Sequence, residues 1–353
     1  MPVLLDTDLF GKAVELRGSN CLNIGLVNNM PDAAVAATER QFLDLIRAAT
    51  PDTVVRLKLY SIPGVPRAGP MRSEFEQRYS DISQLWRARL DGVIVTGNEP
   101  RTGKLADEPY WPDLRNLVDW ARDNTASAIW SCLAAHAAVL HAEGIEREPL
   151  KEKLFGVFDG NVVQPDPLLR GSAQRLRVPH SRHNALAEAA LVAGGYRILA
   201  RSDEIGADMF VRQETSGSLF VFFQGHPEYE ANTLAREFRR DVARYLRGER
   251  DAFPTPPHGY LNAETAALVE TFRGRAVSAR DESLMADFPM TAIEAGVENT
   301  WRDAAVRIYA NWIEHLKERK AERRISAVPV HGTRRHSGHR APPRKPAKIR
   351  SAG

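Results

Sequence analysis

A cysteine, a histidine and a glutamate are the residues of this chain whose types and spacing could perform nucleophilic catalysis. Cys132 lies where an apolar run, residues 128–130, meets a helix-forming run that begins at Leu133. A side chain at such a strand–helix junction is lifted out of the sheet and placed at a helix N-terminus, where backbone N–H groups favour a thiolate. Free cysteines are also often buried, so this stretch alone is equally consistent with an inert core residue.

The base and the carboxylate that would serve this cysteine lie in a second motif, far along the chain. His226 and Glu228 flank Pro227 directly after the apolar run of residues 219–224. Proline cannot continue a strand ladder, so the chain turns there and leaves both side chains at a strand end. A histidine near a cysteine can act as general base, and a carboxylate behind the imidazole fixes its tautomer. Together the two motifs favour a catalytic triad over a surface turn with incidental polar residues.

The predicted elements around these motifs alternate between short buried strands and helices. Strands are expected at residues 21–27, 53–60, 92–97, 128–131, 154–163, 196–200, 209–213 and 219–224, and helices at 33–49, 81–90, 111–122, 133–141, 232–247 and 301–324. In the first half this order indicates an α/β fold, a doubly wound, mostly parallel sheet with helices on both faces. Ligands bind beyond the carboxyl ends of such strands, so the loops after Val27, Gly97 and Cys132 should converge.

Composition excludes several other classes of protein. A hydrophobic content of 43% and a charged content of 26% are ordinary for a globular domain. The two cysteines make no disulfide framework and no metal motif, and the histidines show no metal-ligand spacing. No apolar run is long enough to cross a membrane, and the N-terminus does not have the pattern of a signal peptide. We therefore expect a cytoplasmic protein without a metal site.

Charge divides the chain into three parts. Residues 326–353 hold seven lysines and arginines and no acid, and removing these charges from the net +3 leaves residues 1–325 at −4. We expect an N-terminal arm over residues 1–20, a single α/β domain over 21–325 and a basic, disordered tail over 326–353. The tail has no aromatic residues for base stacking, so a solvated extension is favoured over a nucleic-acid-binding module.

Seven motifs, in order and with near-matching spacing over about residues 20–317, resemble one enzyme family. They are Asn29-Met30-Pro31, Val95-Thr96-Gly97, Tyr110-Trp111-Pro112, residues 152–157, Pro179-His180-Ser181-Arg182, residues 225–229 and Asn311-Trp312. The family is that of the homoserine O-acyltransferases, which transfer succinyl or acetyl groups. The resemblance implies a flavodoxin-like, class I glutamine amidotransferase-like fold, in which the cysteine likewise precedes a distant His-x-Glu motif.

The resemblance also implies a reaction and roles for the three residues. Cys132 would take the acyl group from an acyl-CoA as a thioester, His226 would deprotonate the thiol and later the hydroxyl of L-homoserine, and Glu228 would orient His226. The product would serve methionine biosynthesis. Two separate half-reactions predict ping-pong kinetics with acyl-CoA as co-substrate and no bound cofactor. The family resemblance further suggests a homodimer.

Three more positions match the substrate-binding residues of the family. They are Lys153, Ser181 and Arg240. Homoserine carries a carboxylate, which a guanidinium such as that of Arg240 can hold with two hydrogen bonds. Charge patterning alone would assign both Lys153 and Arg240 to the solvated surface. The oxyanion hole is expected from the backbone N–H groups of Leu133 and of Asn98, in the loop after Gly97.

The acyl donor is the least determined part of the prediction. The position that in this family carries a small residue with succinyl-CoA, or a glutamate with acetyl-CoA, is Arg101 here. Arginine is neither, but its charge could pair with the free carboxylate of a succinyl group, which favours succinyl-CoA. Residues 98–100 also depart from the usual loop, so an unusual donor or another hydroxy amino acid such as serine stays open.

A Cys-His-Glu amidotransferase or hydrolase on the same fold is the alternative activity. Glutamine amidotransferases have glycines beside the nucleophile and a glutamine that helps to hold the substrate. Here Cys132 is followed by Leu-Ala-Ala-His and preceded by serine. This departure counts against amide hydrolysis and favours acyl transfer.

Overall fold

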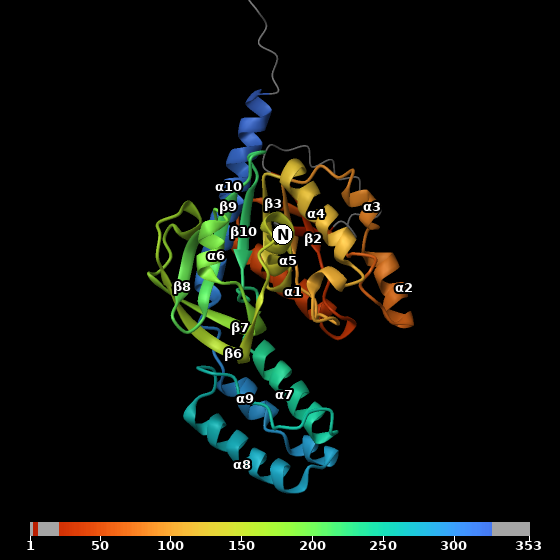
Figure 1. Cartoon of the computed structure of the whole chain (residues 1–353), viewed down its shortest axis with the longest axis vertical. Coiled ribbons are helices and arrows are strands. Elements are labelled where there is room, and N and C mark those ends of the chain that lie inside the picture. The colour runs from red at the N-terminus through yellow and green to blue at the C-terminus, as the bar shows by residue number, and fades with distance from the viewer. Residues whose placement is uncertain (1–2, 6–20, 327–353) are drawn as a thin grey trace, which may run out of the picture.

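The computed structural model describes residues 3–5 and 21–326, in which one ten-stranded sheet is covered by helices on both faces (Figure 1). The strands are β1 (Val3–Leu5), β2 (Cys21–Val27), β3 (Val54–Tyr60), β4 (Gly92–Val95), β5 (Ser127–Ser131), β6 (Glu148–Val162), β7 (Arg175–Ala185), β8 (Arg197–Ser202), β9 (Gly206–Gln213) and β10 (Leu219–Phe223). The helices are α1 (Asp32–Ala49), α2 (Gly69–Arg78), α3 (Ile82–Leu85), α4 (Trp111–Asn124), α5 (Leu133–Glu143), α6 (Glu188–Ala193), α7 (Thr233–Leu246), α8 (Ala263–Ala279), α9 (Met290–Gly296) and α10 (Arg302–Ser326).

The sheet has a parallel half and an antiparallel half. Its strand order is β1-β3-β2-β4-β5-β10-β9-β8-β6-β7. The pairs from β1 to β10 are parallel, and those from β10 to β7 are antiparallel. The predicted α/β fold with a mostly parallel sheet is therefore confirmed. Adjacent β5 and β10 both end at the same edge, since Ser131 pairs with Phe223.

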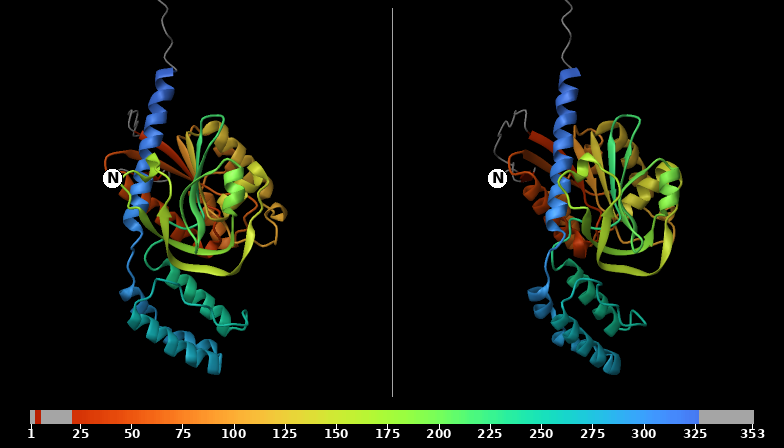
Figure 2. Two further views of the ribbon diagram at one scale, coloured as in Figure 1. Left: turned by 60° about the vertical axis from the view of Figure 1, so that its left-hand side comes forward. Right: turned by 90° about the vertical axis from the view of Figure 1, so that its left-hand side faces the viewer.

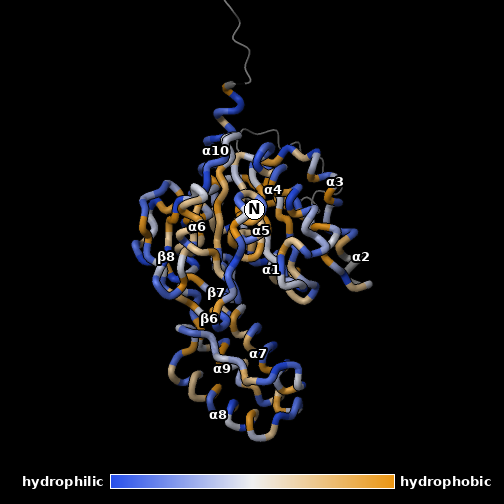
Figure 3. The backbone as a smooth tube through the Cα atoms, viewed as in Figure 1, coloured by the Kyte–Doolittle hydropathy of each residue, from blue (hydrophilic) through white to orange (hydrophobic). Residues whose placement is uncertain are grey.

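Apolar side chains on the two faces of the sheet form two separate cores. On one face α1 and α10 contribute Phe42 and Trp312, and Figure 2 shows the long α10 running along this face. On the other face α4, α5 and α6 contribute Leu117, Val139 and Leu191. Figure 3 shows the hydrophobic residues concentrated along the central strands and the hydrophilic ones on the outer helices and loops. This two-sided burial explains why the central strands are almost continuously apolar.

A helical lobe extends from the carboxyl end of the sheet. It comprises α7, α8 and α9, which lie below the sheet in Figure 1. These helices share a third core, formed by residues such as Phe238, Phe272 and Ile293. Helix α7 lies next to β6 and β7, where its Glu237 contacts Ser181 and its Asp241 contacts Lys153. The lobe therefore supplies one wall beside the strand ends.

Several predicted elements differ from the structure. Residues 3–5, expected in an unstructured arm, form β1 against β3, and the helix expected at 81–90 is only the short α3. The hydrophobic pattern of the sequence does not predict β7, α2, α6, α8 or α9. The 11-residue β7 was overlooked because Arg175, Arg177 and Arg182 interrupt its apolar pattern.

Other expectations fall on parts of the chain that the structure does not describe. The remaining residues of the expected arm, 6–20, and the basic tail from residue 327 onwards lie outside the described residues. The assignment of residues 21–325 to one domain stays a prediction. Among the described helices, none combines the length and the apolar character that crossing a membrane requires.

Candidate active site

Cys132 lies in a strained turn between β5 and α5. Its backbone has φ 52° and ψ −114°, and among the described residues it is the only non-glycine with a positive φ. Such strain persists only where surrounding contacts enforce it, and it is concentrated at functional sites. The Cys132 N–H donates to the carbonyl of Phe223 at 2.8 Å, which fixes the turn against β10. The thiol is thus held at the N-terminus of α5, as the junction predicts.

His226 and Glu228 follow β10 and lie at the same edge of the sheet. Nδ1 of His226 is 2.8 Å from Oε1 of Glu228, and both side chains are buried. Burial alone would lower the pKa of His226, but the Cys132 sulfur and the Glu228 carboxylate, which both hydrogen-bond the ring, raise it well above its ordinary value. The structure therefore brings all three predicted triad residues together, with the imidazole between the sulfur and the carboxylate.

A buried polar network holds the backbone that carries His226. The N–H of Gly225 donates to Oδ1 of Asp208 at 3.0 Å, and the N–H of His226 donates to the carbonyl of Pro179 at 2.8 Å. A Cβ atom at Gly225 would lie 2.5 Å from Cγ1 of Val178 and 2.8 Å from the Asp208 carboxylate. Only glycine fits this position. The close packing of the residues after β10 against β7 and β9 therefore fixes the position of His226.

Glu237 on α7 contacts all three residues that are expected to bind substrate. The Ser181 hydroxyl donates to Oε2 of Glu237 at 2.5 Å. The Lys153 ammonium lies 3.7 Å, and the Arg240 guanidinium 3.8 Å, from the same oxygen. The sequence analysis did not identify Glu237. A signal was present, because it precedes Arg240 by three residues and so shares its helix face.

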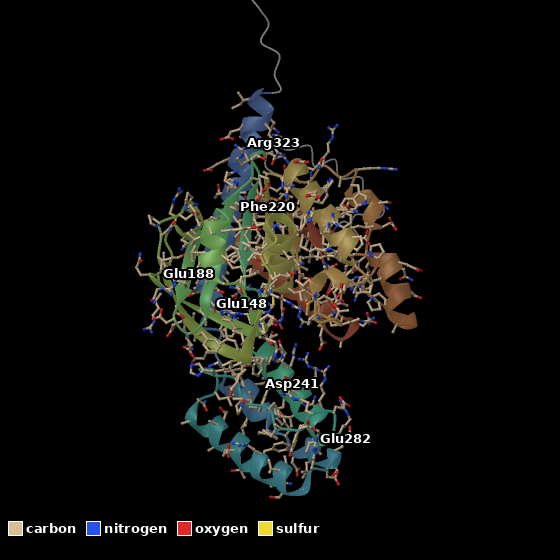
Figure 4. All side chains as sticks on the ribbon, in the orientation of Figure 1. Glu148, Glu188, Phe220, Asp241, Glu282 and Arg323 are labelled. Atoms are coloured by element: carbon tan, nitrogen blue, oxygen red, sulfur yellow. The ribbon has the colours of Figure 1, made fainter. Side chains whose placement is uncertain are left out.

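Asp241 lies one turn after Glu237 on α7 (Figure 4) and is surrounded by further positive charge. Its carboxylate lies 3.2 Å from Lys153, 3.4 Å from Arg240 and 3.4 Å from Arg250. Burial would raise the pKa of Asp241, but these cations, Lys153 and Arg240 foremost, hold it below its ordinary value. The surroundings of α7 therefore combine two hydrogen-bonded carboxylates, Glu237 and Asp241, with several cations, which suits a zwitterionic ligand.

Tyr229 lies between His226 and the charged cluster around Glu237, which comprises Lys153, Glu237, Arg240 and Asp241. Its ring is stacked on His226, and its hydroxyl donates to Oε1 of Glu237 at 2.7 Å. Its electrostatic surroundings include both Cys132 and Glu237. A ligand held by the charged cluster would consequently lie next to the imidazole and the thiol.

The loop after β4 lies against the first turn of α5, next to Cys132. A Cβ atom at Gly97 would lie 3.1 Å from the backbone nitrogen of Leu133, so this loop packs directly on the first turn of α5. Leu133 is the first residue of α5, where an N–H has no intrahelical acceptor. Arg101 follows in the same loop with an exposed side chain, and its N–H donates to Oε1 of the buried Glu108 at 2.7 Å. The roles predicted for Asn98, Leu133 and Arg101 stay predictions.

Comparison with known proteins identifies the family. The family model described as Homoserine O-succinyltransferase matches residues 12–322. Homoserine O-succinyltransferases of Rhodopseudomonas palustris and Bradyrhizobium japonicum are 48% and 49% identical to this chain over 295 and 298 residues. The alignments cover 84% of this chain and 88% and 90% of those proteins, respectively. Among solved structures, a glutamine amidotransferase from Methylobacillus flagellatus has a TM-score of 0.47 at 16% identity, covering 90% of this chain and 99% of that one. On the match of the family model and of these relatives, the chain belongs to the homoserine O-succinyltransferase family and is an acyltransferase.

Proposed function

We propose that this protein transfers the succinyl group of succinyl-CoA to the hydroxyl of L-homoserine, with Cys132 carrying the group as a thioester. The observation that carries the proposal is the contact of the Cys132–His226–Glu228 triad with the Glu237 cluster through Tyr229. The relatives from R. palustris and B. japonicum, which bear the name homoserine O-succinyltransferase, support the choice of substrates. The product would enter methionine biosynthesis.

In the first half-reaction the Cys132 thiolate attacks the thioester carbonyl of the acyl-CoA. The oxyanion that forms accepts hydrogen bonds from the N–H groups of Leu133 and Asn98. The carbon–sulfur bond to CoA breaks, and the proton of the His226 imidazolium passes to the departing CoA thiolate. This leaves an acyl thioester on Cys132, a neutral imidazole and free CoA.

In the second half-reaction homoserine binds beside the loaded thiol. Its ammonium is placed against Glu237, and its carboxylate against Arg240 and Lys153, because these groups carry the complementary charges and lie 3.7–3.8 Å from one another. Neutral His226 takes the proton of the homoserine hydroxyl, the oxygen attacks the thioester, and the thiolate of Cys132 leaves. Glu228 holds the imidazole in the required tautomer through both steps. The proton taken from homoserine stays on His226, and together with the released thiolate it restores the starting ion pair.

Intact-protein mass spectrometry tests this sequence of steps. Mixing with succinyl-CoA should add one succinyl group, Cys132→Ala should abolish the addition, and homoserine should then discharge it. Initial rates should follow a ping-pong pattern. A sequential pattern, or an acyl group that persists in Cys132→Ala, would contradict the thioester route. Discharge by serine or by water at the rate seen with homoserine would instead favour the serine or hydrolase alternative.

A further inference from the structure

A buried arginine lies on the opposite face of the strand that carries the substrate-binding serine. In β7 the side chain of Ser181 contacts Glu237 on α7. Its neighbours His180 and Arg182 point to the other face, because side chains alternate along a strand. Both neighbours are buried, with exposed fractions of 0% and 4%, and the reaction scheme above uses neither of them. A buried guanidinium persists only where its charge is compensated, so its contacts indicate its role.

The guanidinium of Arg182 fixes the tautomer of His180. Nε of Arg182 donates to Nδ1 of His180 at 3.2 Å, and its terminal nitrogens donate to the carbonyls of Asn184 at 2.8 Å and Ile205 at 2.5 Å. Burial, together with the charge of Arg182, lowers the pKa of His180 well below its ordinary value, so the ring is neutral. Since Nδ1 of this neutral ring accepts a hydrogen bond, the ring proton is on Nε2.

Nε2 of His180 lies next to the carboxylate of Asp208 on β9. The distance to Oδ1 is 3.3 Å, and the same oxygen accepts the N–H of Gly225 at 3.0 Å. The contact with His180 is electrostatic, because Nε2 makes no well-aligned hydrogen bond to any described residue. Burial raises the pKa of Asp208 to about 6, against the N–H of Gly225 and the charges of Arg182 and His226. Above that pH the neutral ring lies between a buried anion and a buried cation, which compensate each other.

Asp208 also holds the backbone from which His226 projects. Besides its contact with the N–H of residue 225, its carbonyl oxygen accepts the N–H of Gln224 at 2.9 Å. The N–H of His226 itself donates to the carbonyl of Pro179 on β7. Three consecutive N–H groups are thus held by β9 and β7, two of them by Asp208. The position of the imidazole therefore depends on that of Asp208.

We propose that Arg182 and His180 hold Asp208 in place, and that this carboxylate thereby positions the base for both half-reactions. The inference rests on the proposed function, in which His226 is the base. Loading and discharge of Cys132 both need the imidazole, so a displaced base slows both steps by a similar factor. A residue of the acceptor site alone would slow only the discharge.

Single-turnover rate constants, which do not depend on the fraction of folded protein, separate the two half-reactions. Loading is measured as CoA release from succinyl-CoA, and discharge as loss of the acyl mass from Cys132 after homoserine is added. Asp208→Ala removes the carboxylate, and Asp91→Ala is the matched control. Asp91, directly before β4, likewise accepts a backbone N–H, that of Asn23 at 2.8 Å, and contacts a cation, Lys320 at 2.6 Å.

We expect Asp208→Ala to slow loading and discharge alike by about 10- to 100-fold, because a buried N–H loses its acceptor and the base shifts. Asp91→Ala should leave both rate constants close to those of wild type. Unchanged rates in Asp208→Ala, or a loss confined to discharge, would overturn the proposal. If the wild type itself loads no acyl group on Cys132, the proposed function fails instead.

A double-mutant cycle tests whether Arg182 acts through Asp208. Arg182→Gln keeps a donor for His180 but leaves the anion uncompensated, and Asp208→Asn keeps an acceptor for the N–H of Gly225 but leaves the cation uncompensated. Each change alone should slow loading about tenfold, and the two together should lose much less than the product of both factors. Losses that simply multiply would show that Arg182 acts independently of Asp208 and would contradict the proposed chain of contacts.

Discussion

The imidazole of His226 lies stacked on the ring of Tyr229, with centroids 4.3 Å apart and ring planes inclined by 15°. The same tyrosine donates its hydroxyl hydrogen to Glu237. One side chain therefore contacts the proposed base with its ring and the proposed acceptor site with its oxygen. In the proposed reaction, the binding of the amino acid and the orientation of the base are therefore connected through this residue.

Replacing Tyr229 by phenylalanine should separate these two contacts. The ring stack on His226 is retained, whereas Glu237 loses one of its hydrogen bonds and is held less firmly. We expect the KM for homoserine to rise about tenfold, the effect of a hydrogen bond to a charged group, while the rate of Cys132 acylation stays close to that of wild type. Steady-state kinetics and single-turnover loading measure the two quantities.

Tyr79→Phe is the control for this change, because its hydroxyl also contacts a buried glutamate, Glu39, and not Glu237. It should leave the KM for homoserine unaltered. If Tyr229→Phe slowed acylation as much as acyl transfer to homoserine, the hydroxyl would be acting on the triad and not on the acceptor site.

The raised pKa of His226 predicts a specific dependence of stability on pH. A histidine whose folded pKa exceeds its unfolded value of about 6.5 contributes stability that is fully present below that value. The contribution is lost as the pH rises through the folded pKa. Urea unfolding between pH 6 and pH 9 should therefore show a steeper loss of unfolding free energy in wild type than in His226→Gln. The exposed His258→Gln should follow wild type, and parallel curves for wild type and His226→Gln would argue against the ion pair.

The sequence predicts the features that follow from local residue patterns, but not those that depend on contacts between residues far apart in the chain. The strands observed at 21–27, 92–95 and 127–131 were predicted to within two residues at their ends, because strands buried on both faces are continuously apolar. Cys132 was located from the change of periodicity at the strand–helix junction. In contrast, Glu237 appears in the sequence as an ordinary charged residue. Its importance depends on contacts with Ser181 and Tyr229, which only the folded chain brings together.

His136 should make the protein sensitive to acid. It is buried in α5, with Nε2 2.9 Å from Oε1 of Gln224, and burial lowers its pKa to about 3. Between pH 6.5 and that value the unfolded chain binds a proton that the folded chain does not, so stability falls as the pH falls, by about 1.4 kcal/mol for each pH unit at most. His136→Gln keeps a donor for Gln224 without titrating. Its acid-unfolding midpoint should lie at lower pH than that of wild type; a midpoint at higher pH would contradict this account.

Two glycines offer a matched pair that tests how the His226 backbone is positioned. Gly225→Ala places a methyl group against Val178 and Asp208, at distances that real Cβ atoms do not show. The backbone must therefore shift next to His226. A displacement of about 1 Å at a reacting group can reduce the rate about 100-fold. Gly274 lies in the exposed interior of α8, with open space around a Cβ. Gly274→Ala should stabilise the protein by roughly 0.5–1 kcal/mol without changing its activity, since alanine favours the helix.

Thermal unfolding and acyl-transfer rates measured on both variants check the comparison. Gly225→Ala should lose activity while remaining folded at the assay temperature, as judged by circular dichroism. Restoring space with the additional change Val178→Ala should recover part of the rate, because the shortest contact, 2.5 Å, is to Cγ1 of Val178. Full activity in Gly225→Ala would show that the Asp208–Gly225 contact does not set the position of His226.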